Sequence, residues 1–194
     1  MKRYLILILI SLAPLVVSAQ TKTVVKFSYM PAISLGKTAD FTNGFSPRGG
    51  DFGVDMFLSE DISVGLSIGW NVFREKVVGE SFEYRDYLVT GTQFRYTNIV
   101  PLNIKANKYF GNNERRPFIG LGMGTSYARQ TNDAGIFSFV DDQWQFNLSP
   151  EAGIQTLLRP GLMGSFKLKY SYSFEANGFP AMSYLGFGLG IGFL

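Results

Sequence analysis

The stretch Ile62–Phe73, read as ISVGLSIGWNVF, alternates large apolar residues with serine, glycine and asparagine. Successive side chains of a β-strand point to opposite faces, so a period of two predicts a strand with one apolar face and one small polar face. A helix over these residues would scatter its apolar side chains around the axis. The same pattern returns near the end of the chain, at Leu185, Phe187, Leu189, Ile191 and Phe193. Both segments indicate an all-β protein.

The alternation and the polar segments between its runs predict eight strands. They are expected at Thr23–Ser34, Gly50–Leu58, Ile62–Phe73, Thr90–Phe110, Pro117–Arg129, Trp144–Leu157, Leu162–Glu175 and Met182–Leu194. The connections 59–61, 111–116 and 158–161 are short, 176–181 is intermediate, and 35–49, 74–89 and 130–143 are long. Short turns at one end and long loops at the other are typical of one fold. The predicted fold class is therefore all-β, an eight-stranded antiparallel up-and-down transmembrane β-barrel.

Residues 1–19 have the pattern of a secretory signal peptide. Met1-Lys2-Arg3 is basic, residues 4–17 are apolar, and Val17-Ser18-Ala19 supplies small residues before Gln20. This run is too short and wrongly flanked for a spanning helix, so we expect cleavage before Gln20 and a barrel domain over residues 20–194. The expected localisation is the cell outer membrane, after signal-peptide-dependent export. The chain has no cysteine, which excludes both a lipid anchor and a disulfide framework.

The two faces of the strands decide between membrane and water. A soluble barrel fills its interior with apolar side chains, whereas here the small polar face suits a narrow wet lumen and the apolar face suits lipid. Aromatic residues gather toward the loop end of the apolar face, and they predict a lipid-facing girdle at Trp70, Tyr96, Tyr127, Trp144 and Tyr172, together with Tyr184.

Extending the alternation along every strand places charged and amide side chains inside the barrel. The inward set is Lys26, Asp55, Arg95, Lys105, Glu151, Gln155, Lys167 and Lys169. The candidate lumen network within it is Arg95, Lys105, Glu151, Lys167 and Lys169. Because the sixth and seventh strands are neighbours, Glu151 is expected to reach Lys167 or Lys169. The favoured interpretation is a paired network that fills the barrel, and the alternative is a gated or narrow anion path.

The residue inventory argues against catalysis and against a bound cofactor. The sequence contains no histidine, so a serine or water nucleophile lacks its usual base and a histidine metal site cannot be built. The glycine runs at 120–124 and 186–192 recur at every second residue inside strands, whereas a dinucleotide loop needs a turn and a helix. We therefore predict no catalytic residue, no metal site, no cofactor and no enzymatic activity. The near-neutral charge of residues 20–194 gives no support for a nucleic-acid partner.

Two segments carry a resemblance to a known family. Tyr96–Lys105, read as YTNIVPLNIK and followed by Tyr109-Phe110-Gly111, resembles a recurrent segment of small outer-membrane barrels of Bacteroidota. Pro117–Gly124, read as PFIGLGMG, resembles the next strand of OmpA-like barrels, whose members are often called porin-family proteins. This sequence departs from the pattern by an inserted Val100, which puts the register near Pro101 in question. The resemblance implies an eight-stranded outer-membrane barrel that the barrel assembly machinery inserts.

These observations favour a non-enzymatic outer-membrane protein with a structural or surface-interaction role through long extracellular loops. The alternative function is a narrow porin-like channel or carrier for small solutes. The expected partners are outer-membrane lipid and lipopolysaccharide, the barrel assembly machinery during insertion, and an external partner that the sequence does not name. We expect a monomer.

Overall fold

The computed structural model describes residues 22–84, 87–111 and 114–194. The predicted signal peptide lies outside the described residues. A short helix, α2 (Gly36–Phe41), interrupts an otherwise β chain. The strands are β1 (Thr23–Tyr29), β2 (Ala32–Leu35), β3 (Phe45–Ser46), β4 (Gly49–Phe57), β5 (Ile62–Tyr84), β6 (Tyr87–Tyr109), β7 (Arg115–Ala134), β8 (Phe137–Arg159), β9 (Leu162–Ser173) and β10 (Met182–Phe193).

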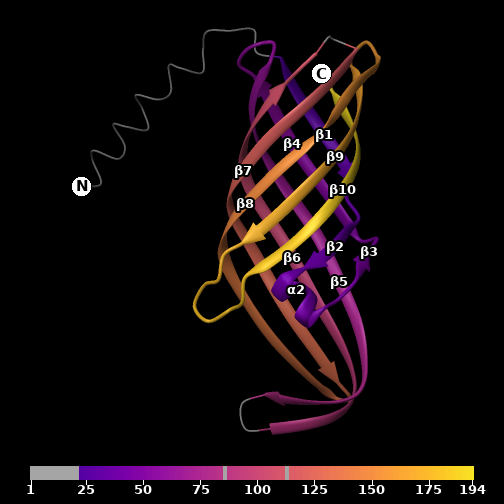
Figure 1. Cartoon of the computed structure of the whole chain (residues 1–194), viewed down its shortest axis with the longest axis vertical. Helices are drawn as coiled ribbons and strands as arrows, with labels where there is room; N and C mark the ends of the chain where they lie inside the picture. Colours follow the sequence, from indigo (N-terminus) through magenta and orange to yellow (C-terminus); the bar gives the residue numbers. More distant parts are fainter. Residues whose placement is uncertain (1–21, 85–86, 112–113) are drawn as a thin grey trace, which may run out of the picture.

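The strands form one closed antiparallel barrel (Figure 1). From β4 to β10 each strand pairs with the next, β1 pairs with β4, and pairing of β1 with β10 closes the ring. β2 continues the course of β1, and β3 and β4 together form the second strand, so the ring has eight strands. The predicted eight-stranded antiparallel barrel is confirmed. Among the residues the structure describes, no helix is long and apolar enough to cross a membrane.

The predicted first strand is divided at Pro31. Proline has no backbone N–H and cannot donate to a sheet ladder, which accounts for a break at this position. β1 pairs with both β4 and β10, whereas β2 keeps β10 as a partner and takes β3 as the other. The Pro31 carbonyl still accepts a hydrogen bond from the Phe187 N–H at 2.8 Å. The chain therefore keeps its place beside β10 across the break.

Two of the predicted long loops are wrong, because the strands continue through them. β5 and β6 remain paired beyond residue 74, with Lys76 opposite Phe94, and β7 and β8 remain paired with Thr131 opposite Val140. The four strands thus extend past the barrel as two long hairpins (Figure 1). The charged residues of these segments suggested solvated loops, but an exposed hairpin accepts charge on its faces as readily as a loop does. A register shift between Val77 and Glu80 interrupts the first hairpin.

The faces of the wall follow the predicted alternation. Leu66 and Leu189 are about three-fifths exposed on the outside, whereas Ser67 is buried inside. The inward glycines let the strands approach closely, since a Cβ on Gly65 would lie 2.2 Å from the Val54 carbonyl oxygen. The register across Pro101 is continuous, because each residue of β6 from Gln93 to Tyr109 has its partner on β7 without a shift.

Candidate functional site

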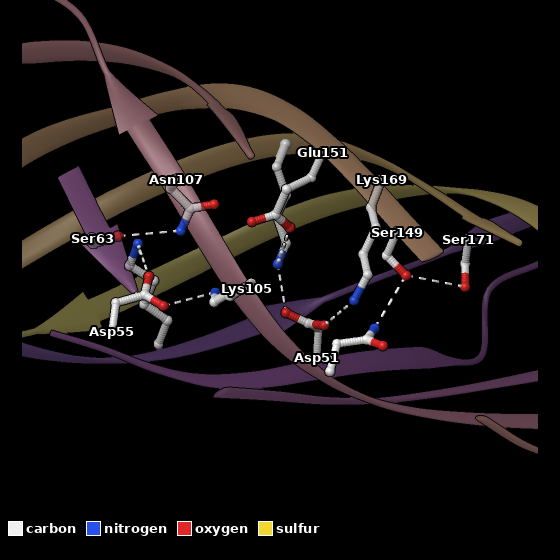
Figure 2. A network of polar contacts seen from close by, with 12 residues as sticks. Asp51, Asp55, Ser63, Lys105, Asn107, Ser149, Glu151, Lys169 and Ser171 are labelled. Carbon is white, nitrogen blue, oxygen red and sulfur yellow. Dashed lines mark hydrogen bonds and ion pairs between the residues drawn. The ribbon is translucent and has the colours of Figure 1, made fainter. Parts of the chain in front are cut away.

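The centre of the lumen holds a cluster of ion pairs around Asp51, which projects from β4 (Figure 2). Lys167 on β9 places its Nζ 2.5 Å from Asp51 Oδ1, and Lys169 places its Nζ 2.8 Å from Asp51 Oδ2. Glu151 on β8 joins at 3.6 Å from the Lys167 ammonium. All four side chains are at least 90% buried. Two lysines and two carboxylates therefore balance each other in this cluster, which we call the Asp51 cluster.

A second cluster lies nearer the short-turn end, around Asp55. Lys26 on β1 reaches Asp55 Oδ2 at 2.7 Å, and Lys105 on β6 reaches Oδ1 at 3.1 Å. Lys26 also donates a hydrogen bond to the Tyr109 hydroxyl at 2.9 Å. Asp55 is fully buried. This Asp55 cluster holds two lysines against one carboxylate, so the two clusters together carry one excess positive charge.

Each cluster contains an ion pair between strands that are not neighbours in the sheet: Asp51 with Lys167, and Asp55 with Lys105. Asp51 and Lys167 are separated by β1 and β10, so their contact crosses the lumen. An ion pair in such a place has lost its water, and its attraction offsets that loss only when geometry is good and each charge has a partner. The short distances and the mutual partners meet this condition. The clusters therefore connect separate parts of the barrel wall and stabilise the closed barrel.

Amide and hydroxyl side chains fill the next level toward the loop end. Asn103 donates to the Ser149 hydroxyl at 3.1 Å, and Asn147 donates to the hydroxyls of Ser171 at 2.9 Å and Ser173 at 3.1 Å. Each of these side chains is almost fully buried. Figure 2 shows Ser149 and Ser171 next to the Asp51 cluster, and a hydrogen bond joins their two hydroxyls at 3.4 Å.

The loop end of the lumen is closed by an apolar cluster and by the first loop. The apolar cluster comprises Ala32, Phe73, Ile99, Ala128, Phe179, Met182 and Tyr184, all buried. The first loop lies across it: Thr38, in α2, accepts a hydrogen bond from the Ser183 N–H at 2.8 Å. The hydroxyls of Thr42 and Thr97 meet at 2.8 Å, which ties the end of this loop to β6. The loop thus spans the mouth from β10 to β6.

Aromatic rings occupy the short-turn end of the lumen. The Tyr109 ring centroid lies 5.4 Å from that of Phe118 and 5.2 Å from that of Phe57. The Arg116 guanidinium stands 5.0 Å from the Tyr109 centroid and forms an ion pair with Asp61 at 3.3 Å. Side chains thus pack both ends of the lumen as well as its centre.

Four of the five predicted network residues lie in the two clusters. Lys167, Lys169 and Glu151 belong to the Asp51 cluster, and Lys105 belongs to the Asp55 cluster. Arg95 does not join them. Ten residues separate it from Lys105 on β6, about 33 Å of strand, and its guanidinium lies 5.7 Å from the Phe41 ring. Arg95 therefore lies beyond the mouth, because β6 extends well past the barrel.

The sequence prediction missed Asp51, although it holds the central place. A signal for it was present: Asp51 and Asp55 are four residues apart on one strand, so both point to the same face. The other inward residues take secondary positions. Gln155 is buried and contacts the Met163 sulfur at 2.6 Å rather than a charge.

The predicted girdle residues lie on the outer face. Trp70 and Trp144 are each 58% exposed. The rings of Tyr127 and Trp144 pair across strands at 5.4 Å, and Tyr172 meets Phe174 edge-on at 4.9 Å. The Arg74 guanidinium lies 5.6 Å from the Tyr96 ring.

The inclusion of Tyr184 in the girdle was wrong. This side chain is 2% exposed, and it packs 5.9 Å from the Phe73 ring inside the barrel. Tyr184 shares its face with Gly186 and Gly188, whereas Leu185 and Leu189 face outward. Alternation on β10 therefore assigns it to the lumen.

The lumen chemistry offers ion pairing and little else. Within the described part of the chain, no group of three or more histidine, cysteine, aspartate or glutamate side chains could hold a metal ion. Each lumen carboxylate is engaged by a lysine ammonium. A carboxylate held in this way is poorly placed to act as a free general base.

Comparison with solved structures places the fold among small outer-membrane barrels. Neisserial surface protein A has a TM-score of 0.59 at 12% identity, over 90% of this chain and 99% of that one. A major outer membrane protein of Thermus thermophilus has a TM-score of 0.57 at 13% identity with the same coverage. The attachment invasion locus protein Ail of Yersinia pestis has a TM-score of 0.54 at 12% identity, again over 90% and 99%.

These similarities establish a shared architecture. No protein-family model matches the chain, and no curated protein matches it. The resemblance to Bacteroidota barrels therefore stays a prediction.

Proposed function

We propose that the chain is a non-enzymatic integral protein of the Gram-negative outer membrane, with a closed barrel as support and a loop end that meets external partners. The outer face supports a lipid environment, since Leu66, Ile104 and Leu189 are each more than half exposed. Lipid offers no hydrogen-bond partner to a strand edge, so spanning strands require a closed ring such as the one that β1 and β10 complete.

The observation that carries the proposal is the filled lumen. Aromatic rings, two ion-pair clusters, an amide level and an apolar cluster follow one another along the barrel axis. The interior of an eight-stranded barrel is just wide enough for side chains to fill. A solute path would need several of these levels to separate together. The structural role therefore has better support than the narrow channel or carrier.

Planar-bilayer recording tests this choice. We expect the refolded mature protein to insert without conductance steps, while a general porin refolded in the same detergent gives clear steps. Reproducible conductance that tracks protein concentration would overturn the closed-lumen role and favour the channel.

The membrane location has a separate test. We expect heat-modifiable migration in detergent gels, and extraction from membranes only by detergent. A mature chain that stays monodisperse in buffer without detergent would contradict the assignment of the outer face. Unchanged lipid A and phospholipids after overexpression are expected of a non-enzymatic barrel, and a new deacylated product would contradict this part of the proposal.

The remaining partners follow from the fold and the resemblance. We propose insertion by the barrel assembly machinery and a monomeric barrel, because the ring itself has no unpaired strand. The external partner would meet the two long hairpins and the first loop. A single species of monomer mass by light scattering, after correction for detergent, is the expected result.

A further inference from the structure

Three exposed basic side chains lie beside one another where the outer apolar face ends. The outward residues of β5 run Leu66, Ile68, Trp70 and Val72, and then change to Arg74 and Lys76. Exposed Arg48 adjoins them, because its carbonyl accepts a hydrogen bond from the Val72 N–H at 3.0 Å. We call Arg48, Arg74 and Lys76 the basic patch. It lies just past Trp70, on the side of the barrel that the proposed function turns toward lipid.

Aromatic rings of the neighbouring strand support this patch. The Arg74 guanidinium lies 5.2 Å from the Phe94 ring and 5.6 Å from the Tyr96 ring. The Lys76 ammonium lies 5.8 Å from the Phe94 ring. A ring face beneath a cation holds it in place without neutralising it. The patch is therefore ordered on the outer face, and its charge stays available to a ligand.

No carboxylate of the described residues forms an ion pair with any member of the patch. Glu75 lies between Arg74 and Lys76 but accepts the Asn43 N–H at 2.8 Å. Asp133, opposite Phe94, accepts a hydrogen bond from Ser138 at 2.6 Å. Arg129 on β7 differs from the patch, since Asp142 stands directly opposite it. Among the side chains that the structure describes, the positive charges of the basic patch therefore have no ion-pair partner.

The patch lies at the outer edge of the lipid headgroup layer and just beyond it. Arg74 is four residues beyond Trp70, about 13 Å of strand, which a tilt of about 45° reduces to roughly 9 Å along the membrane normal. The polar layer outside the hydrocarbon is roughly 5–8 Å thick on each side. Long basic side chains at this level reach headgroup phosphates, and guanidinium groups bind phosphate through paired hydrogen bonds.

We propose that the basic patch binds the phosphates of an outer-leaflet glycolipid of the lipid A class, with the acyl chains against the apolar face beside Trp70. This inference rests on the proposed outer-membrane location. It assigns the lipid contact to β5 and β6 rather than to β7 and β8, where Asp133 and Asp142 would repel phosphate.

Fluorescence of a single tryptophan tests the site. The chain has two tryptophans, so Trp144→Phe leaves Trp70 as the reporter next to the patch. The mature protein, refolded in detergent micelles, is titrated with bisphosphorylated lipid A and with lipid A from which both phosphates have been removed. We expect saturable binding of the phosphorylated probe, weakened by added salt, and binding of the other probe at least tenfold weaker.

Charge removal defines the site. R74Q/K76Q should weaken binding by about fivefold for each charge removed, or about 25-fold together. The matched control R115Q/R159Q removes two exposed cations at the short-turn end and should change binding less than twofold. Arg48 lies over no aromatic ring of the described residues, so R48Q tests the charge alone and should weaken binding about fivefold.

Several results would overturn the inference. Unchanged binding by R74Q/K76Q, an equal loss in the control, or equal binding of the two lipid probes would each do so. Stronger binding of a soluble sulfated oligosaccharide than of lipid A would assign the patch to a surface polysaccharide instead. Heat-modifiable migration of each variant reports the folded barrel independently, so failure of this site leaves the proposed function standing.

Discussion

Neutralising Asp51 is the sharpest test of how the lumen is held. D51N keeps the shape of the side chain but removes the carboxylate that meets Lys167 at 2.5 Å and Lys169 at 2.8 Å. Lys167 would keep Glu151 at 3.6 Å, whereas Lys169 would lose its ion-pair partner. Removing one partner of a buried pair costs about 3–5 kcal/mol. We expect the free energy of unfolding to fall by that amount.

The assay is a urea titration in detergent micelles, followed by tryptophan fluorescence and by the heat-modifiable gel shift. The surface pair of Asp61 and Arg116 is the control, because Asp61 is 61% exposed and D61N should cost less than about 1 kcal/mol. D51N/K169M removes the stranded ammonium together with the carboxylate, and should recover at least half of the loss. A D51N barrel within about 1 kcal/mol of the wild type would refute the reasoning, since it would mean that water screens the lumen charges.

Three further perturbations address the wall and the mouth. L66R puts a charge on the outer face of the barrel and should reduce stability in lipid by about 2–4 kcal/mol, whereas T92R on the extended hairpin should fold normally; equal behaviour in a vesicle-folding assay would contradict the face assignment. G65A should lower the free energy of unfolding by about 1–3 kcal/mol, because the added Cβ would lie 2.2 Å from the Val54 carbonyl oxygen. In the same urea titration G50A should be neutral, because its Cβ would lie 3.8 Å from the nearest atom, the Ser28 carbonyl oxygen. T42V removes a hydroxyl bond to β6 and should speed limited proteolysis of the first loop without opening the barrel; an unchanged cleavage rate would mean that this bond does not hold the loop.

The period of two was enough to predict the ring, because a barrel wall repeats one local rule along every strand. The same rule covers Asp51 and Tyr184, whose faces follow from Asp55 and from Gly186, so both were within reach of the sequence. Tyr184 was misjudged because residue type was given more weight than position, since an aromatic near the loop end suggested a girdle. Asp51 was left out of the inward set although Asp55, on the same face, was included. Arg95 shows the opposite limit, since its face was correct and the predicted strand Thr90–Phe110 already included it, but the pattern does not show where along that strand the barrel ends.

The first loop was predicted at 35–49, but its place across the barrel mouth could not have been predicted. Its closure of the mouth depends on contacts between α2 and β10 and between Thr42 and β6, which are remote in sequence and leave no periodic signal. The partners of the lumen charges that lie on strands without a shared ladder were hidden for the same reason. Strand register predicts contacts only between neighbouring strands, and it therefore predicted the contact of Glu151 with Lys167. The shorter contact to Asp51 crosses the barrel between strands that share no ladder.

That crossing also bears on how the ring stays closed. The seam between the first strand and β10 consists of two ladders, Val25 to Tyr29 on β1 and Ala32 to Leu35 on β2, which are interrupted at Pro31. Asp51 lies on the strand at one side of this seam and Lys167 on the strand at the other side, so their ion pair forms only when the ring is closed. Because the ion pair is absent when the sheet is open between β1 and β10, its whole interaction free energy stabilises the closed barrel relative to the open one. We therefore infer that the Asp51 cluster holds the ring closed where β1 meets β10. The loss of stability expected for D51N should appear mainly as faster unfolding of the barrel rather than as slower folding.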